Sequence, residues 1–286
     1  MLEKVLEINM RSKIGYAVLC FILLINVILS AYAEEPKELT IFCGAGLAGA
    51  FNEIWQLYEN ASDIGVAFNF DGVPSLRAQI ENGAYADVLV SSNLKHMDAL
   101  KAEGLINNST VKIFARNKVA VVVPNDNPAN IVNLTDLARP GIMILMGTRE
   151  LPIGDYARQV LDKLANDSEY GPEYKEKVIS NIVSEETTVN RIVSKVALGE
   201  VDAGFAFMSD VSPSMVGKVT KIPIPDKYNV VGDFPVGVLS QSNNTQEAQA
   251  FIDVIMSNEG QAILDKYGFI PVAKDEADGA TTSAAI

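Results

Sequence analysis

The stretch from Leu39 to Phe51, LTIFCGAGLAGAF, joins a short apolar segment to a helical pattern through a run of the smallest residues. The apolar residues 39–43 predict a buried strand, and the spacing of apolar residues after Leu47 predicts a helix. Residues 44–46 lie between the two and offer almost no side chain. Because small residues let another group approach the backbone, this turn is expected to present main-chain N–H groups to a ligand. The stretch therefore predicts a strand–loop–helix unit of an α/β fold.

Outward from this stretch, apolar strand segments and helical segments alternate along the chain. Further strands are expected at 65–70, 86–92, 118–124, 142–147, 202–210 and 234–240, and helices at 76–82, 95–103, 154–165 and 245–268. The strand at 86–92 is apolar almost throughout, which is typical of a parallel sheet covered on both faces. The alternation predicts two doubly wound α/β units, with long strands near 114–124 and 222–238 as candidate crossings between them.

The two ends of the chain differ from this pattern. Residues 14–33 form an apolar run that follows Arg11 and Lys13 and closes with the small residues of Ala31–Ala33. This predicts a cleaved signal peptide over residues 1–33, and hence a protein exported to the periplasm or the cell surface. The run is also long enough to span a membrane, so a retained anchor is the alternative. Residues 273–286 have no apolar pattern and are expected to be disordered.

Charge and residue content argue against several classes of function. The net charge of −13 argues against general binding of nucleic acid. His96 is the only histidine, and it is expected on the surface of its helix. The sequence has no CxxC, HExxH, Walker A or G-x-S-x-G motif. We therefore expect a binding protein rather than an enzyme, with no cofactor and no bound metal cation.

Two longer segments carry a resemblance to a known family. They are ELPIGDYARQVLDKL (Glu150–Leu164) and VNRIVSKVALGEVDAGFAFMSDV (Val189–Val211). Both resemble the periplasmic molybdate-binding proteins of ABC transporters, within the type II solute-binding superfamily, and the similarity extends over roughly 39–272. The resemblance implies two lobes of mostly parallel, doubly wound sheet, joined by two hinge strands. Lobe I is then expected over 34–118 and 230–272, and lobe II over 119–229.

The resemblance also implies a function. Such a protein captures molybdate or tungstate between its lobes and delivers it to the permease and ATPase subunits of an ABC importer, and it is expected to be a monomer. A tetrahedral dianion accepts hydrogen bonds but donates none at neutral pH, so a site made only of donors fits it. Backbone N–H groups at helix N-termini are such donors. The alternative is the same fold with another oxyanion or a small organic acid as its ligand.

Alignment to the family's motifs gives the candidate ligand-binding residues. They are Ala45, Gly46, Leu47, Val73, Ser75, Ile153, Val189 and Phe207, with Arg149, Thr148, Thr188 and Ser209 as auxiliary candidates. Known members are expected to place hydroxyl groups where this chain has Gly46, Val73 and Phe207. Losing three charge-assisted hydrogen bonds costs on the order of 5 kcal/mol unless other groups replace them.

Four kinds of replacement for these hydroxyls remain open. The backbone N–H groups of 44–47 form the first, and nearby hydroxyl side chains form the second. The third is direct neutralisation of the anion by Arg77 or Arg149. The fourth is a carboxylate that adds a ligand to the metal of the oxyanion, for which Asp71, Glu150 and Asp155 are candidates.

Overall fold

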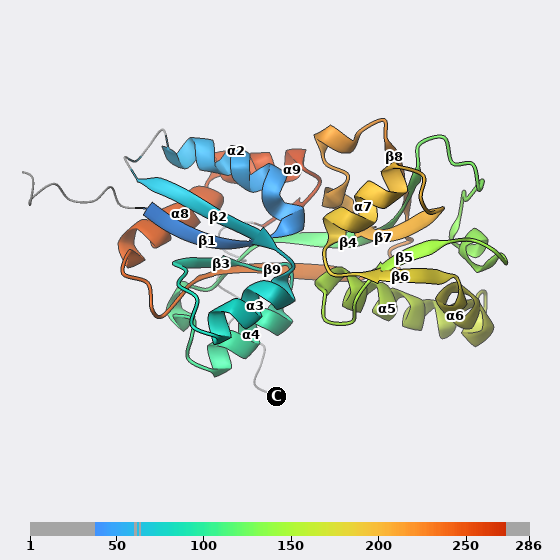
Figure 1. The fold of residues 1–286 in the computed structure, drawn as a ribbon, viewed down its shortest axis with the longest axis horizontal. Coiled ribbons are helices and arrows are strands. Elements are labelled where there is room, and N and C mark those ends of the chain that lie inside the picture. The colour runs from blue at the N-terminus through green and yellow to red at the C-terminus, as the bar shows by residue number, and fades with distance from the viewer. Residues whose placement is uncertain (1–37, 60–61, 63, 273–286) are drawn as a thin grey trace, which may run out of the picture. The chain divides into compact units, whose positions relative to one another are not determined.

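The computed structural model of the chain describes residues 38–59, 62 and 64–272, and these residues fold as strands flanked by helices (Figure 1). The expected signal peptide and the expected disordered tail lie outside the described residues. The strands are β1 (Glu38–Gly44), β2 (Gly65–Asp71), β3 (Val88–Val90), β4 (Lys112–Pro124), β5 (Ile144–Gly147), β6 (Ile182–Glu186), β7 (Ala203–Phe207), β8 (Val219–Pro223), β9 (Val231–Val238) and β10 (Ile270–Pro271). The helices are α2 (Ala48–Glu59), α3 (Val73–Glu81), α4 (Leu94–Ala102), α5 (Pro152–Ala165), α6 (Gly171–Ser180), α7 (Val189–Ala197), α8 (Thr245–Ile255) and α9 (Asn258–Lys266).

The strands pair in the order β2-β1-β3-β9-β4-β7-β5-β6, with β8 and β10 paired to β4 off this path. β1 is parallel to β3, and β5 is parallel to both β6 and β7. β4 and β9 run antiparallel to their neighbours. The predicted α/β fold class is confirmed. The parallel pairs are formed by the outer strands, whereas the long strands β4 and β9 pair antiparallel with each other and with their other neighbours.

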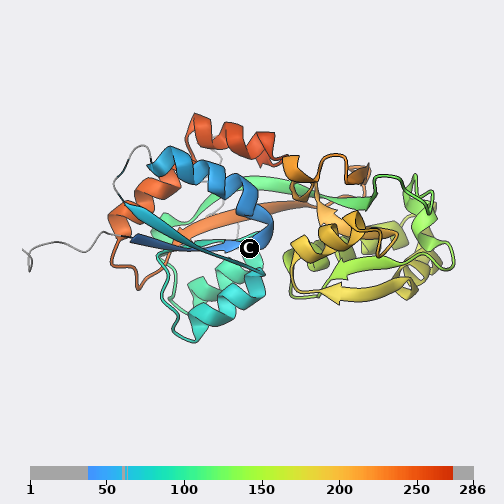
Figure 2. The same cartoon turned by 45° about the horizontal axis from the view of Figure 1, so that its top comes forward.

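Both faces of β1 and β3 are buried, as their apolar sequences predict. Ile41 and Val88 belong to the main apolar core together with residues of α2 and α8. Phe42 and Leu89, one position further along each strand, belong to a second cluster with residues of α3 and α4. Successive side chains of a strand point to opposite faces, so the two clusters lie on opposite sides of the sheet. Figures 1 and 2 show α2 and α9 on one side of these strands and α3 and α4 on the other.

Strand β4 changes its hydrogen-bonding partner between Lys118 and Val119. It pairs with β9 up to Lys118 and with β7 from Val119. The crossing expected at 114–124 is therefore one continuous strand. The crossing expected at 222–238 is divided, because residues 224–230 lie between β8 and β9 and belong to neither. Asn229 bridges this break, since its buried amide accepts from the Val119 N–H at 3.0 Å and donates to the Val119 C=O at 2.8 Å.

Two local expectations differ from the structure. The helix expected at 245–268 is divided into α8 and α9, because the Ser257 side chain accepts a hydrogen bond from Gly260 N at 3.0 Å and starts a new helix. The surface position expected for His96 is wrong, since this residue is only 2% exposed. The chain before α5 packs over that face of α4, and His96 Nε2–H donates to the Glu150 C=O at 2.8 Å.

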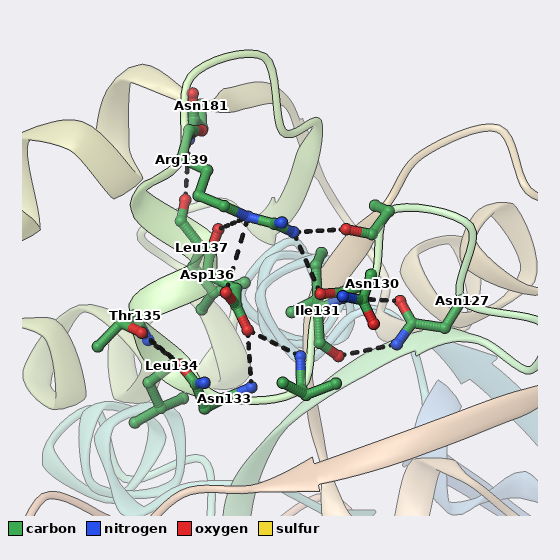
Figure 3. Close-up of polar contacts among 12 residues, drawn as sticks. Asn127, Asn130, Ile131, Asn133, Leu134, Thr135, Asp136, Leu137, Arg139 and Asn181 are labelled. Atoms are coloured by element: carbon green, nitrogen blue, oxygen red, sulfur yellow. Dashed lines mark hydrogen bonds and ion pairs between the residues drawn. The ribbon is translucent and has the colours of Figure 1, made fainter.

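The loop between β4 and β5 is held by side chains that bond to the backbone (Figure 3). Asn127 and Asn130 have positive φ angles of 41° and 49°, a region that Asn tolerates better than most residues. The Asn127 side chain bonds the N–H and C=O of Ile131 at 3.0 and 2.9 Å. Asn181 donates to the C=O of Arg139 at 2.8 Å, which ties the loop to the end of α6. None of these residues lines the cavity described below.

Candidate functional site

A small cavity lies where several strands reach their carboxyl ends. Its volume is about 30 Å³, enough for a small ion, since one water occupies about 10–15 Å³ on this measure. Open α/β sheets bind ligands at this edge. The lining residues come from the ends of β1, β2 and β7 and the segments that follow them, from the turn after β3, from the starts of α5 and α7, and from Phe234 and Phe269 elsewhere in the chain. They are Gly44, Ala45, Gly46, Leu47, Asp71, Gly72, Val73, Ser92, Leu151, Pro152, Ile153, Thr188, Val189, Phe207, Ser209, Asp210, Phe234 and Phe269.

Four helical segments begin at this cavity without a side-chain cap. Gly44 precedes the 3-10 helix Ala45–Leu47, which leads into α2, and Gly72, Leu151 and Thr188 precede α3, α5 and α7. None of these four residues accepts a hydrogen bond through its side chain from the first turn that follows. The first N–H groups of a helix have no partner within it and carry partial positive charge. The cavity therefore receives main-chain donors from four separate segments.

Most of the predicted ligand-binding residues line this cavity. They are Ala45, Gly46, Leu47, Val73, Ile153, Val189 and Phe207. Among the auxiliary candidates, Thr188 and Ser209 line it, whereas Thr148 and Arg149 do not. Ser75 also lies outside the lining, because its hydroxyl points back to Asp71 and donates to Oδ2 at 2.6 Å.

The other charged candidates lie elsewhere, with one exception. Of the three carboxylates considered as ligands, only Asp71 lines the cavity. Glu150 is paired with Lys95 at 2.7 Å, and the hydrogen bond from Lys95 is the main reason that its pKa is lowered. Arg77 is paired with Glu81. No basic side chain is thus among the described residues of the lining, which leaves main-chain N–H groups as its sources of partial positive charge.

Two hydroxyl groups of the lining are free to bind a ligand. Ser92 and Thr188 have no side-chain hydrogen-bond partner among the described residues, whereas Ser209 Oγ accepts from Asn117 Nδ2 at 2.7 Å. Thr188 was predicted as an auxiliary residue, but Ser92 was not predicted. Its position in the polar segment SSN (91–93), at the carboxyl end of the expected strand 86–92, is the signal that points to it.

The structure also adds a carboxyl group that the sequence-based prediction did not include. Asp210 ends the 3-10 helix Met208–Asp210, directly after β7, and is 9% exposed. Its Oδ2 accepts from the Phe207 N–H at 2.6 Å. Its Oδ1 has no hydrogen-bond partner among the described residues. Burial raises the pKa of Asp210 to about 7, and the Phe207 N–H opposes this only in part.

Gly46 and Gly72 allow the two sides of the cavity to come close together. A Cβ atom on Gly46 would lie 2.5 Å from Asp210 Oδ1, and one on Gly72 would lie 2.4 Å from the Thr187 C=O. Near Gly46, Asn190 Nδ2 donates to the Ala45 C=O at 3.1 Å. The segments around β1 and β2 are therefore in direct contact with those around α7 and β7.

Aromatic rings close the inner wall of the cavity. The ring centroids of Phe207 and Phe234 are 5.2 Å apart, and those of Phe234 and Phe269 are 5.8 Å apart, both in edge-to-face arrangements. Such a wall excludes water, and hydrogen bonds to a ligand are stronger in the resulting low dielectric.

Among the described residues that line the cavity there is no histidine and no cysteine. Over the described residues, no group of three or more His, Cys, Asp or Glu is placed to hold a metal ion. Within the same residues, no helix has both the length and the apolar content needed to cross a membrane. The cavity is therefore defined by what lines it, namely the starts of four uncapped helical segments, two carboxyl groups and several apolar side chains.

Comparison with known proteins gives the family. The family model described as bacterial extracellular solute-binding protein matches residues 39–270, and the chain belongs to this family. It is 30% identical over 237 residues to the molybdate-binding protein ModA of Mycobacterium tuberculosis, which covers 82% of this chain and 85% of the relative. The chain is thus a solute-binding protein of the ABC-importer type and not an enzyme.

Solved structures show the same fold at lower identity. The periplasmic molybdate-binding protein of Azotobacter vinelandii has a TM-score of 0.70 at 19% identity, over 82% of this chain and 99% of that one. The sulfate-binding protein SubI of M. tuberculosis has a TM-score of 0.73 at 18% identity, over 87% of this chain and 92% of that one. At these identities the likeness describes the fold alone.

Proposed function

We propose that this protein is exported and binds molybdate or tungstate for an ABC importer, delivering the oxyanion to a permease and its ATPase. The observation that carries the proposal is the meeting of four uncapped helical segments at one cavity without a basic side chain. Backbone donors suit a fully deprotonated tetrahedral anion, because they offer hydrogen bonds and accept none. The oxyanion is the cargo and not a cofactor, and the protein acts as a monomer.

Two lobes that close on the anion are part of this proposal. We infer lobe I from 34–118 with 230–272, and lobe II from 119–229. The exchange of β4 partners between Lys118 and Val119 supports this boundary. The contacts of Gly46 and Asn190 across the cavity support a closed form, in which the donors of both lobes reach one ligand.

In this proposal, backbone N–H groups and two free hydroxyl groups replace the three hydroxyl donors that the family is expected to have and this chain lacks. In this proposal the first-turn N–H groups at Gly46, Val73, Ile153 and Val189 bind the anion, and Ser92 and Thr188 add side-chain donors. Arg149 is not needed, because it borders a separate cavity with Arg158 and Lys175.

Thermal unfolding with a panel of anions tests the proposal. A ligand present at 100 times its Kd stabilises by about 2.7 kcal/mol, which raises the Tm of a chain of this size by roughly 5–10 °C. We expect this shift with millimolar molybdate or tungstate, and little or none with sulfate or phosphate. If molybdate and tungstate leave the Tm unchanged while another solute raises it, the ligand assignment is wrong.

A small organic acid is the second candidate, and the apolar lining favours it. Leu151, Ile153 and Phe207 offer no hydrogen bonds from their side chains, and they suit a hydrocarbon portion of a ligand. The small volume of the cavity argues the other way, because an organic acid would require the lobes to remain further apart. Mass spectrometry of natively purified protein distinguishes the two: bound organic acid without molybdenum or tungsten would favour this candidate.

A further inference from the structure

We propose that Asp210 is itself a ligand-binding residue, and that its protonated Oδ1 donates a hydrogen bond to the bound oxyanion. This inference rests on the proposed oxyanion-binding function and adds a proton to it: when Asp210 is ionised in the free protein, one proton enters the site with each dianion.

The position of the carboxyl group is the first argument. The Phe207 N–H bonds Oδ2 at 2.6 Å, which fixes that oxygen as the acceptor and leaves Oδ1 as the oxygen on the side of Gly46, a residue of the same lining. Oδ1 lies where it would be 2.5 Å from a Cβ on Gly46. By resemblance, this is the loop where the family has a hydroxyl donor, so the Asp210 carboxyl occupies the space that a side chain at Gly46 would need.

The charges around the carboxyl group are the second argument. Asp71 lines the same cavity, with its own oxygens bonded by Gly72 N at 2.7 Å and Ser75 Oγ at 2.6 Å. Lys221, near the start of the 3-10 helix Met208–Asp210, donates from Nζ to the Met208 C=O at 3.2 Å and not to Asp210. Tyr267 lies across a second cavity that Asp210 also borders. Within the described part of the chain no basic group compensates an ionised Asp210, so a dianion beside it favours the protonated form.

Protonation converts this residue from an obstacle into a donor. An ionised carboxylate has only acceptor oxygens and repels an oxyanion, whereas a carboxylic acid has one O–H to donate. Burial already brings the pKa of Asp210 to about 7 before any anion is bound. Above that pH, Asp210 is ionised in the free protein. The protein then takes up one H⁺ together with the dianion, and the product is the complex with protonated Asp210. No covalent bond forms or breaks except the O–H bond at Oδ1.

The test is calorimetric titration with molybdate at pH 6 and pH 8. For the wild type we expect about tenfold weaker binding at pH 8, since each pH unit above the pKa of the free protein costs about a factor of ten. Titrations at pH 8 in buffers of different ionisation enthalpy should show uptake of close to one proton per anion, and this measurement needs no variant.

Two variants separate the role of Asp210 from general acidity of the site. In Asp210→Asn the Phe207 N–H holds the amide oxygen, so the NH₂ group faces the cavity and donates at every pH. We expect this variant to bind at pH 8 about as tightly as the wild type at pH 6, with less than about twofold pH dependence. In the matched control Asp71→Asn, which changes the other carboxyl of the lining, the tenfold pH dependence should remain.

The outcomes distinguish this inference from the function on which it rests. Wild-type binding that is tight but independent of pH and without proton uptake overturns the role of Asp210 and leaves the function intact. The same holds if Asp210→Asn, with unchanged Tm, binds more than tenfold weaker than the wild type at pH 6. A wild type that binds neither molybdate nor tungstate at either pH overturns both.

Discussion

Gly46 has no room for a side chain, because Asp210 and Val189 lie directly opposite it. A Cβ atom there would be 2.5 Å from Asp210 Oδ1 and 2.9 Å from Val189 Cγ1. Gly46 lies in a 3-10 helix that most residues can adopt, so the requirement for glycine comes from close approach and not from backbone conformation. It therefore applies only when the two sides of the cavity are together.

Gly46→Ala should weaken ligand binding and leave the ligand-free protein almost as stable as before. Overpacking of this kind costs about 1–3 kcal/mol, which is roughly 5- to 150-fold in Kd. We expect the cost to fall on the closed form, because the proposed separation of the lobes would relieve the clash. Calorimetric Kd values for molybdate, together with the Tm of the free protein, measure both effects.

Cys43→Ala is the matched control for this substitution. Cys43 is buried, lies three residues before Gly46, and is not among the described residues that line the cavity. Its loss should lower stability by about 1 kcal/mol without changing the Kd. Equal Kd values for wild type and Gly46→Ala would show that the two sides do not approach as closely as described.

The residues proposed to bind through their backbone N–H groups could be predicted from the sequence. The residues whose role depends on the direction of a side chain were less predictable. Gly46, Val73, Ile153 and Val189 follow from alignment to the family's motifs, and all four line the cavity. Asp210 stands in the quoted segment FMSD, but nothing in that pattern says that its carboxyl group is buried and directed at Gly46. Such contacts join residues far apart in the chain, and no local periodicity encodes them.

At the scale of elements, helix α4 is linked to the chain before α5 by two adjacent side chains. Lys95 pairs with the Glu150 carboxylate at 2.7 Å, and His96 donates to the Glu150 C=O at 2.8 Å. Alternating strands and helices are readable from apolar periodicity, and most elements lie where they were expected. The sequence of α4 does not reveal which neighbour covers its polar face, and for this reason His96 was wrongly expected at the surface.

His96→Ala should destabilise the protein by about 1–3 kcal/mol, because it leaves the Glu150 C=O without its donor. His96→Gln keeps an N–H of similar reach and should lose less. The free energies of unfolding in urea at pH 7 give this comparison. If the alanine variant is as stable as the glutamine variant, the hydrogen bond to Glu150 contributes nothing.

Comparison of the wild type with His96→Gln also predicts the sign of the change in folding stability with pH. Burial is the main reason that the pKa of His96 is lowered from its ordinary value of 6.5. As the pH falls below about 6.5, the unfolded chain takes up the proton first, so the folded state becomes less stable. The wild type should therefore lose more stability than His96→Gln between pH 7 and pH 5. An equal loss in both would mean that His96 titrates alike in the folded and unfolded states.

At the scale of the whole molecule, one apolar core extends through two strand groups, which are β1, β2, β3 and β9 on one side of β4 and β5, β6 and β7 on the other. Ile41 of β1, Val121 of β4 and Leu145 of β5 belong to the same buried cluster. The sequence predicted two units with crossings, but the strand β4, buried along most of its length, makes them share a core. The described residues are therefore expected to unfold together in one thermal transition, although the lobes are proposed to move apart for ligand exchange.

Substitution of Asn229 tests whether the two strand groups unfold together. Its amide side chain, 6% exposed, bonds both backbone groups of Val119 where β4 changes partners. Asn229→Ala leaves those groups unsatisfied, and we expect a loss of about 2–3 kcal/mol, or roughly 4–12 °C in Tm, still in a single transition. The exposed Asn166→Ala is the control and should change the Tm by less than about 2 °C. Calorimetry that resolves two transitions in the Asn229 variant, or in the wild type, would show instead that each strand group has a core that is stable without the other.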